Sequence, residues 1–510
     1  MPVSLLDCFS LLAGFALLNV YMKRRRNPSG LPLPPGPTPL PLIGNILDIP
    51  KRVPWETYAR WAHQYGDLLS LRVFGETIVI INSPRIARDL VEKRAAIYSD
   101  RPVVHAYEVM KLDFNLVMAK YTSDKWKIGR KLADHSLRQS AAMVYRPMQI
   151  RRVRQFLKKI TRRDDIWENL KYMTAGIVMS LTYGYNIAES NDTFVAHVED
   201  VLQRASSALL PGTTLINIFP SLKYLPAWLP GMSFKRDALS HLGEMKLVVE
   251  APFEFTKGEI IKGVAQPSII SESMDSFSDK ELSEEEERVL KEVAATLYID
   301  STASTLAFFI LALIRHPEVQ KHAQSELDTV VGRDRLPEFE DRNQLPYIQA
   351  ICQELMRWRM ITPLGVLHTT TEDDIYEGFF IPKGSQIMIN SWSMLHDPEA
   401  YPDPEVFRPE RFLAPNGAFI EDLLVASVYG WGRRICPGRF LANATIWATV
   451  ASILSAFNVG KAKDAEGREI PVEGLYTDQG VVCSPLPFKC SITPRDARAE
   501  RLVAATEDID

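Results

Sequence analysis

Residues Tyr429 to Gly438 read YGWGRRICPG, and this stretch decides how the rest of the chain is interpreted. Glycines permit a tight loop and a close approach of the backbone to a flat ligand. Arg434 supplies a charge that an anionic group can pair with. Cys436 stands just before an apolar helix, whose positive end favours the thiolate form. A lone cysteine is usually structural, but the glycines, arginines and Pro-Gly around this one predict a loop that presents a thiolate to a ligand.

This loop resembles the haem-binding loop of the cytochromes P450, FxxGxRxCxG, with Tyr429 in place of the usual Phe. Three further segments resemble family motifs in the family's order: Trp126–Arg130 its WxxxR, Glu354–Arg357 its ExxR and Pro409–Phe412 its PERF segment. The resemblance covers nearly the whole chain. It implies haem b held by Cys436 as the axial ligand, and a thiolate ligand favours O–O cleavage.

The resemblance also assigns supporting roles. It implies that Arg130, His368 and Arg434 pair with the haem propionates, and that Trp126, Gly432 and Gly438 complete the cofactor-binding set. Glu354 and Arg357 stand three residues apart, which places both side chains on one helix face. The family's pattern joins them to Arg411 in a buried structural network, and buried charges need such partners.

The oxygen-activating motif departs from the family's pattern. Asp300 and Ser301 match the acid–alcohol pair of [AG]-G-x-[DE]-[TS], and such a pair can relay protons. Thr302, which follows them, is the third catalytic candidate. Tyr298, however, falls where the family has glycine. Either Tyr298 replaces this glycine directly, or three residues are missing between Ile299 and Asp300.

The second alignment is preferred because the residues from 294 to 299 then match the family as well. Three residues are slightly less than one helical turn. Their loss would rotate the upstream half of the helix by about 60° and draw it in by about 4.5 Å. The departure therefore concerns oxygen activation rather than haem binding.

Composition supports a globular enzyme. The chain has 510 residues, of which 46% are hydrophobic and 24% charged, and its formal net charge is −4. This balance argues against a nucleic-acid binder, which usually has a strong basic excess. The 5 cysteines include no CxxC pair, so neither a disulfide framework nor a zinc cluster is expected.

The N-terminus predicts a membrane anchor. Residues 3–22 are mostly apolar and long enough to cross a bilayer as a helix. The basic run at residues 23–26 and a proline-rich hinge to residue 37 follow, and by the positive-inside rule the basic run stays cytosolic. We expect a single-pass protein of the endoplasmic reticulum, with a cytosolic catalytic domain over residues 38–494 and a charged, mobile C-terminal tail over residues 495–510.

The fold class expected is mainly α with a minor β region, as in the cytochrome P450 fold, where haem lies between a long central helix and the cysteine loop. Alternating residues predict a strand pair at Ser70–Val73 and Thr77–Asn82. A long apolar helix is expected over Leu290–Arg315, and another from near Cys436 to about Phe457. The segment Phe219–Phe234, rich in proline and aromatic residues, is either a loop resting on the membrane or an ordinary packed loop.

The leading functional hypothesis is a monooxygenase that takes electrons from an NADPH-cytochrome P450 reductase, with cytochrome b5 as a second candidate donor. Its substrate would be an apolar small molecule, and resemblance to basidiomycete members orders the classes as sesquiterpenoid, polyketide and indole alkaloid. The alternatives are a reductase-independent isomerase or dehydratase, and a haem protein impaired by its altered helix. The candidate substrate contacts are His105, Phe114, Tyr298, Leu364, Val366 and Gly480.

Overall fold

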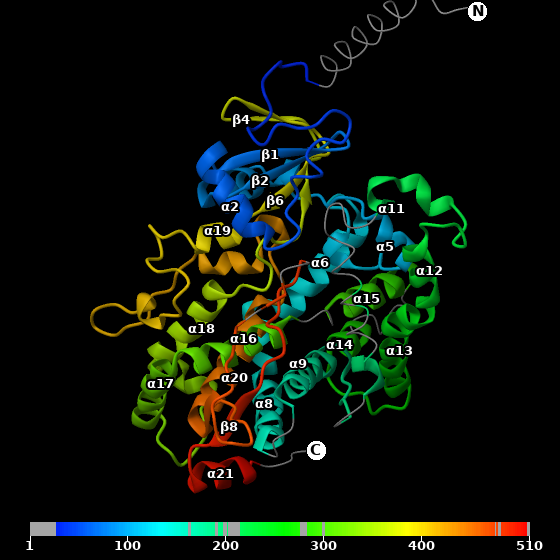
Figure 1. Ribbon diagram of the computed structural model, residues 1–510. Helices are drawn as coiled ribbons and strands as arrows, with labels where there is room; N and C mark the ends of the chain where they lie inside the picture. The colour runs from blue at the N-terminus through cyan, green and yellow to red at the C-terminus, as the bar shows by residue number, and fades with distance from the viewer. Residues whose placement is uncertain are drawn as a thin grey trace, which may run out of the picture.

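The protein was analysed as a computed structural model that describes residues 27–161, 165–188, 192–196, 201, 204, 215–275, 283–297, 301–474, 476–477 and 481–506. It is mainly helical with small sheets, as expected. A sheet-rich region caps one end of a larger helical region (Figure 1). The predicted anchor at residues 3–22 and the basic run at 23–26 lie outside the described residues.

The largest sheet of the described chain has the strand order β1-β2-β6-β3. Its hairpin pairs β1 (Leu68–Val73) with β2 (Glu76–Ile81) antiparallel, close to the predicted strands. β6 (Gln386–Ile389) joins β2 in parallel, and the short β3 (His368–Thr369) closes the sheet. β2 is buried at every position after its first, because α2 (Pro54–Tyr65) and α3 (Pro84–Ala87) lie beside the sheet. The two-stranded sheets are β4 (Asp374–Tyr376) with β5 (Phe379–Ile381), and β7 (Phe457–Lys461) with β8 (Cys490–Pro494).

The proline-rich segment expected to act as a hinge is hydrogen-bonded to strands β1 and β5. The carbonyls of Pro34 and Pro35 accept hydrogen bonds from the side chain and amide of Ser70, at 2.6 and 2.8 Å. The Pro32 carbonyl accepts one from the Phe380 amide at 2.8 Å. Proline cannot donate, but its carbonyl can accept, and three such bonds make this segment part of the folded body.

The helical core is built around two apolar helices, α16 (Thr302–Arg315) and α20 (Arg439–Ala456). Around them pack α8 (Arg146–Thr161), α9 (Ile166–Tyr183), α17 (Pro317–Val330) and α18 (Pro346–Trp358). α16 is buried continuously from Leu306 to Ile314. A helix that is apolar on every face must be covered on every face, which explains its central place.

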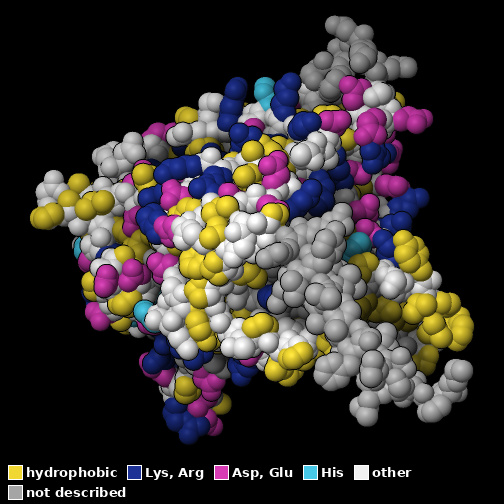
Figure 2. All heavy atoms as spheres, turned by 90° about the horizontal axis from the view of Figure 1, so that it is seen from above, with side chains coloured by type: hydrophobic (Ala, Val, Ile, Leu, Met, Phe, Trp, Pro, Cys, Tyr) yellow, Lys and Arg dark blue, Asp and Glu magenta, His cyan; other side chains and the backbone are white. Residues whose placement is uncertain are grey.

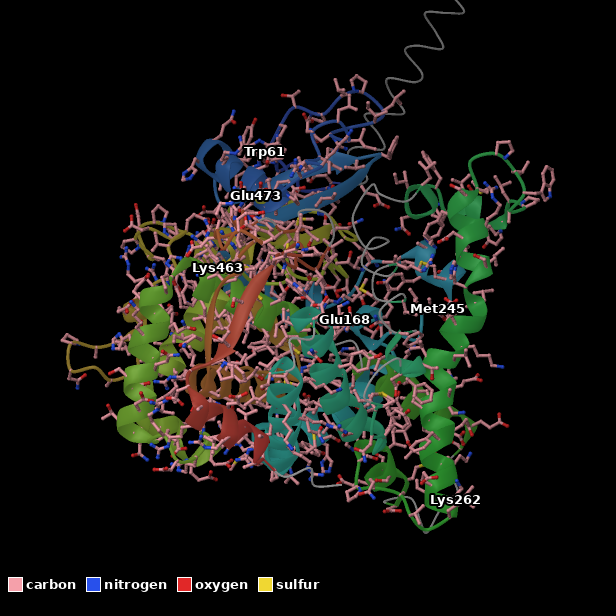
Figure 3. The ribbon with its side chains drawn as sticks, turned by 60° about the horizontal axis from the view of Figure 1, so that its bottom comes forward. Trp61, Glu168, Met245, Lys262, Lys463 and Glu473 are labelled. Atoms are coloured by element: carbon pink, nitrogen blue, oxygen red, sulfur yellow. The ribbon has the colours of Figure 1, made fainter. Side chains whose placement is uncertain are left out.

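A second group of helices covers one side of this core. It contains α5 (His105–Met110), α11 (Leu215–Ile218), α12 (Ser233–Ser240), α13 (Leu242–Ile261), α14 (Ile269–Asp275) and α15 (Glu284–Leu297). Figure 3 shows α13 along this edge, with Met245 near one end and Lys262 at the other. Met245 is buried among apolar residues of α5 and α15, so α13 covers the apolar cluster that these two helices form.

The expected long helix over Leu290–Arg315 is described on both sides of residues 298–300, which lie outside the described residues. α15 covers Glu284–Leu297, and α16 covers Thr302–Arg315. Ser301, the first described residue after this gap, has φ −115° and ψ 4°, outside the helical range. The stretch Glu284–Arg315 is long and apolar enough to cross a membrane, but 73% of its most apolar window is buried inside the protein, as in a core helix.

The C-terminal tail also differs from the expectation of a mobile segment. Residues Ala497–Ala504 form α21, capped by the Asp496 carboxylate, which accepts hydrogen bonds from the amides of Arg498 and Ala499 at 2.9 Å. Ala499 and Val503 are buried one helical turn apart. The tail is docked because this narrow apolar stripe, hidden in a charged sequence, packs against α8 and α20.

Candidate active site

The Cys436 loop is closed by a hydrogen bond at its base. It runs from the end of a 3-10 helix, η7 (Val425–Tyr429), through the turn η8 (Gly432–Arg434) to α20. The Cys436 amide donates to the Tyr429 carbonyl at 2.7 Å. A Cβ added to Gly438 would lie 3.8 Å from the Cys436 sulfur, so glycine keeps this approach to the sulfur open. The Cys436 side chain is exposed, as a ligand-presenting thiol must be.

Gly432 is fixed by contact with the protein itself. Its φ of +55° favours glycine, and a Cβ there would lie 2.4 Å from the carbonyl oxygen of Val91. Val91 belongs to η1 (Arg88–Lys93), a short π-helix beside α4 (Ala95–Tyr98). The structure therefore explains this glycine by backbone packing that holds the loop against η1.

Arg434, two residues before the cysteine, is half-buried. Its guanidinium donates to the carbonyls of Ser99 at 2.7 Å and Ala119 at 2.6 Å, and lies 4.7 Å from the ring centre of Trp126. Burial lowers the pKa of Arg434 to about 10; Asp100 opposes this shift and Arg130 adds to it. Within the described part of the chain, its buried Nη1 atom has no hydrogen-bond partner.

Arg101 is a second cation beside Arg434. It is 3% exposed, and its guanidinium donates to the carbonyls of Val117 at 3.0 Å and of Val366 and Leu367 at 2.6 Å. Burial lowers its pKa well below the usual value, and the charge of Arg434 lowers it further. The sequence analysis missed Arg101, because nothing in its neighbourhood, Ser99 to Pro102, signals a ligand.

His368 and Arg130 complete what we call the Arg434 cluster, formed by Arg101, Arg130, His368 and Arg434. His368 is 4% exposed, and its ring donates from Nδ1 to the Tyr98 carbonyl at 2.8 Å. Burial, Arg101 and Arg434 hold the pKa of His368 well below its usual value. Arg130 lies on α6 (Asp124–Leu137) and donates to the Ile435 carbonyl at 2.5 Å.

The Arg434 cluster has the chemistry of an anion site. Buried guanidinium groups cost free energy unless an opposite charge pairs with them. The Asp100 carboxylate partly offsets the lowering of the pKa of both Arg101 and Arg434, and it also accepts hydrogen bonds from Lys120 at 3.3 Å and the Tyr121 amide at 2.8 Å. The unsatisfied Nη1 of Arg434 and the exposed thiol of Cys436, two residues away, fit a haem carrying propionates and needing a thiolate.

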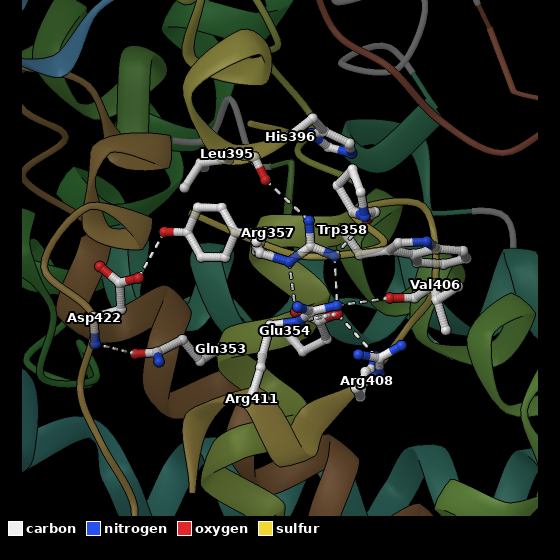
Figure 4. Close-up of polar contacts among 12 residues, drawn as sticks. Gln353, Glu354, Arg357, Trp358, Leu395, His396, Val406, Arg408, Arg411 and Asp422 are labelled. Carbon is white, nitrogen blue, oxygen red and sulfur yellow. Dashed lines mark hydrogen bonds and ion pairs between the residues drawn. The ribbon is translucent and has the colours of Figure 1, made fainter. Parts of the chain in front are cut away.

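The residues of the ExxR and PERF segments meet in a different place, the Glu354 network (Figure 4). Arg357 donates to both oxygens of Glu354, at 2.6 and 2.9 Å, and Arg411 from η6 (Pro409–Phe412) donates at 3.1 Å. Glu354 and Arg357 are 0% exposed. Arg357 also donates to the carbonyls of Leu395 and Pro404, at 2.9 and 2.8 Å. These bonds tie α18 to the segment that leads to the cysteine loop.

The candidate oxygen-activating residues are described in part. Ser301 is the N-terminal cap residue of α16 but makes no side-chain capping bond, and Thr302 opens the helix and is 7% exposed. Tyr298 and Asp300 lie outside the described residues, as does Gly480 among the substrate candidates.

The remaining substrate candidates fall into separate places. Phe114 is buried against α13 and α15, whereas Leu364 packs beside the sheet, near Tyr58 and Leu69. Val366 contributes its carbonyl to Arg101. His105 begins α5, and its ring lies 3.4 Å from Glu108. The structure therefore brings Val366 to the Arg434 cluster, and places Phe114 and Leu364 in different apolar clusters.

The loop, the anion site and the buried Glu–Arg network together define a haem-thiolate protein. The family model Cytochrome P450 matches residues 34–491. The chain is 40% identical to Cytochrome P450 monooxygenase ple1 of Rhodocybe pseudopiperita, over 93% of this chain and 91% of that protein. It is 37% identical to Cytochrome P450 monooxygenase COX1 of Coprinopsis cinerea, over 97% of each, and 37% identical to Cytochrome P450 monooxygenase claR of Ampulloclitocybe clavipes, over 96% and 91%.

The chain therefore belongs to the cytochrome P450 family of haem-dependent monooxygenases. The family binds haem through an axial cysteine thiolate, and Cys436 is the cysteine that stands in this position of the motif.

Proposed function

We propose that this protein inserts one atom of O2 into an apolar small molecule, by hydroxylation or epoxidation, with electrons from an NADPH-cytochrome P450 reductase. The observation that carries the proposal is the exposed Cys436 thiol, two residues from Arg434, whose buried Nη1 atom has no hydrogen-bond partner within the described part of the chain. Haem bound there supplies the redox chemistry, which a thiolate ligand directs toward O–O cleavage. Arg101, Arg130, His368 and Arg434 would hold its anionic groups, and the Arg434 guanidinium lies over the Trp126 ring.

We assign proton delivery to Asp300, Ser301 and Thr302. The adjacent hydroxyl groups of Ser301 and Thr302 at the start of α16 support this role, because a hydroxyl can both accept and donate a proton. Substituting Thr302 by Val should uncouple NADPH use from product, so that more reduced oxygen escapes per product formed. A Thr302→Val protein with unchanged coupling would exclude Thr302 from this role.

The first test is the reduced carbon-monoxide difference spectrum of the full-length protein beside a Cys436→Ala control. A red-shifted Soret band that disappears in the control supports the thiolate assignment. Turnover that requires NADPH and reductase then favours the monooxygenase over a reductase-independent isomerase or dehydratase. A normal band with no turnover, by reductase or by peroxide, favours the impaired haem protein.

We place reductase docking on the face around the Cys436 loop. Four cations, Lys127, Lys131, Arg138 and Arg433, are exposed there, as are the apolar side chains of Ile128 and Met143, although Lys127 pairs with Asp124 at 3.1 Å. Exposed cations together with exposed apolar side chains suit an acidic partner that docks transiently and is steered by charge. Cytochrome b5 is a candidate for the same surface.

We propose a sesquiterpenoid substrate first, then a polyketide, then an indole alkaloid, as a tailoring step of fungal secondary metabolism. The apolar side chain of Val366, whose carbonyl lies beside the Arg434 cluster, supports an apolar ligand. Incubation of the reconstituted enzyme with a panel drawn from the three classes, read by mass spectrometry, tests the order. Oxygenation of indole alkaloids alone would reverse it.

Membrane association at the endoplasmic reticulum is supported by an exposed apolar surface. Phe219, Tyr224, Leu225 and Trp228 lie exposed between α11 and α12, around η4 (Pro220–Tyr224), and the Phe219 ring lies 5.3 Å from that of Phe74. Figure 2 shows hydrophobic side chains gathered at the right edge, where Figure 1 places this segment. We propose that this surface and the single-pass anchor at residues 3–22 hold the catalytic domain on the cytosolic face. Tyr224→Ser with Trp228→Ser should weaken binding of an anchor-truncated chain to phospholipid vesicles.

A further inference from the structure

Tyr429 carries a hydroxyl at a position where the family's motif has Phe. The phenol oxygen lies 2.7 Å from the side-chain oxygen of Asn443 and 3.3 Å from the sulfur of Met356. A tyrosine hydroxyl has one proton to donate, and an amide oxygen accepts far better than a thioether. The hydroxyl therefore donates to Asn443 and rests against Met356.

The two partners of this hydroxyl belong to the two helices that frame the site. Asn443 lies in the second turn of α20, the helix that follows Cys436. Met356 lies on α18, between Glu354 and Arg357 of the Glu354 network. The hydroxyl of Tyr429 thus joins the base of the cysteine loop to the helix after it and to the helix that carries the buried ion pair.

The main chain of Tyr429 holds the cysteine directly. Its carbonyl accepts the hydrogen bond from the Cys436 amide at 2.7 Å, which closes the loop. Gly430 follows with φ +91°, a turn that leaves Tyr429 as the last residue of η7. Any shift of Tyr429 moves the acceptor of the Cys436 amide, because the side chain and the carbonyl belong to one residue.

We propose that Tyr429 is a positioning residue for the Cys436 thiolate, and that its hydroxyl, through Asn443, fixes the loop that holds the sulfur. The inference rests on the proposed function only in taking Cys436 as the haem ligand. A thiolate whose loop is less firmly held is more easily protonated and lost from haem. The hydroxyl therefore protects the thiolate form, a role that a Phe ring alone cannot fill.

The test is Tyr429→Phe in the full-length haem protein, which restores the family's own residue and so retains the ring. The readout is the pH midpoint at which the red-shifted carbon-monoxide band of the reduced protein converts to an unshifted band. One hydrogen bond is worth about 1 kcal/mol, or roughly a fivefold change. The midpoint should rise by about 0.7 pH unit, and the conversion at a fixed pH below neutral should be about fivefold faster.

Tyr347→Phe is the matched control. Tyr347 lies on α18, the helix that carries Met356. Its hydroxyl donates to Glu410 at 2.6 Å, away from the cysteine loop. This variant should leave the midpoint unchanged; an equal shift would show general loosening and overturn the proposal. Asn443→Leu should reproduce the effect of Tyr429→Phe, Asn443→Asp should keep the original midpoint, and Tyr429→Phe should add nothing to Asn443→Leu.

The proposed function and the positioning role of Tyr429 can be contradicted separately. Absence of a red-shifted band in the unsubstituted protein would remove the thiolate assignment, and with it the proposed function. A normal band whose midpoint is the same in Tyr429→Phe would overturn the positioning role alone.

Discussion

The Glu354 network and the Arg434 cluster are both rich in arginine, and each contains one buried arginine, Arg357 in the first and Arg101 in the second, yet they are completed in opposite ways. In the first, Arg357 and Arg411 share one carboxylate, with bonds of 2.6 to 3.1 Å. In the second, Arg101 and Arg434 bond main-chain carbonyls, and one nitrogen of Arg434 is left unsatisfied within the described chain. Carbonyls orient a guanidinium but do not neutralise it.

This difference distinguishes a group of charges with a structural role from one that binds a ligand. A charge group completed by the chain needs nothing further and serves to hold elements together. A charge group that the chain leaves incomplete costs stability in the absence of a ligand and gains it when an anion arrives. The two regions should therefore respond differently to substitution, to haem and to pH.

The largest effect is expected at the Glu354 network. Glu354→Gln removes the carboxylate from Arg357, which is 0% exposed, and leaves two cations without their counter-charge. Loss of one partner of a buried pair costs about 3–5 kcal/mol, so little folded protein should accumulate. The measurement is the yield of soluble, haem-containing protein.

Its matched control is Glu405→Gln. Glu405 pairs with Arg359 at 2.9 Å but its side chain is 58% exposed, and exposed pairs contribute about 0–1 kcal/mol. Equal losses of yield in the two variants would contradict the structural role of the Glu354 network.

The next effect is expected at the Arg434 cluster, in haem affinity. Arg434→Gln keeps a side chain that can donate hydrogen bonds but removes the positive charge that we propose pairs with a haem propionate. Hydrogen bonds to charged groups are worth about 1.5–3 kcal/mol, so haem should be lost roughly 10- to 100-fold faster. The rate is measured by transfer to an excess of apomyoglobin.

The haem-free chain should respond in the other direction. Without haem, Arg434→Gln relieves repulsion with Arg101, so the midpoint of urea unfolding should be unchanged or higher. A variant that lowers the stability of the haem-free chain but retains haem normally would make Arg434 a structural residue like Arg357.

A smaller effect distinguishes the two regions by pH. His368 lies in the Arg434 cluster, and His396 lies near Arg357; burial and the adjacent arginines depress both pKa values well below the usual value. The unfolded chain then binds more protons below about pH 6.5, so stability is complete above that pH and falls as the pH drops. Each histidine contributes a slope of up to about 1.4 kcal/mol per pH unit.

Haem should change only one of these slopes. Propionates beside His368 oppose the repulsion from Arg101 and Arg434, so His368→Gln should reduce the acid slope in the haem-free chain and change it little in the haem protein. His396→Gln should reduce the slope in both. The slopes come from urea unfolding between pH 5 and 7 (a range around the ordinary histidine pKa, about 6.5). An equal effect of His368→Gln in both forms would contradict haem contact by the Arg434 cluster.

Sequence reasoning reached the features that are encoded locally. The Glu354–Arg357 pair could be placed because a spacing of three residues fixes a shared helix face, and Arg411 because its segment matches a family motif. Arg101 could not be found in this way, because its burial depends on carbonyls of Val117, Val366 and Leu367 that only the tertiary fold brings together. The docked helix α21 was missed for a related reason, because the charged composition hid the stripe of Ala499 and Val503.

The smallest effect on haem is expected one residue before Arg434. Arg433 is exposed, and its guanidinium bonds the Tyr121 hydroxyl and lies 5.5 Å from the centre of that ring. Arg433→Gln should change the rate of haem loss by less than about twofold, because exposed side chains away from such sites change stability by about 0.5 kcal/mol or less. The two adjacent arginines, Arg433 and Arg434, would then differ in their effect on haem loss because they differ in burial.

The same substitution should affect electron delivery if reductase docks on this face. Removal of one rim charge slows charge-steered association at low ionic strength, and the difference disappears when salt screens it. Stopped-flow reduction by NADPH-cytochrome P450 reductase should therefore slow several-fold in low salt and match the unsubstituted protein near 0.5 M salt, where the screening length is only about 4 Å. A reduction rate that is unaffected at low salt would move the docking surface away from Arg433, whereas haem loss as fast as in Arg434→Gln would remove the distinction between the half-buried and the exposed arginine.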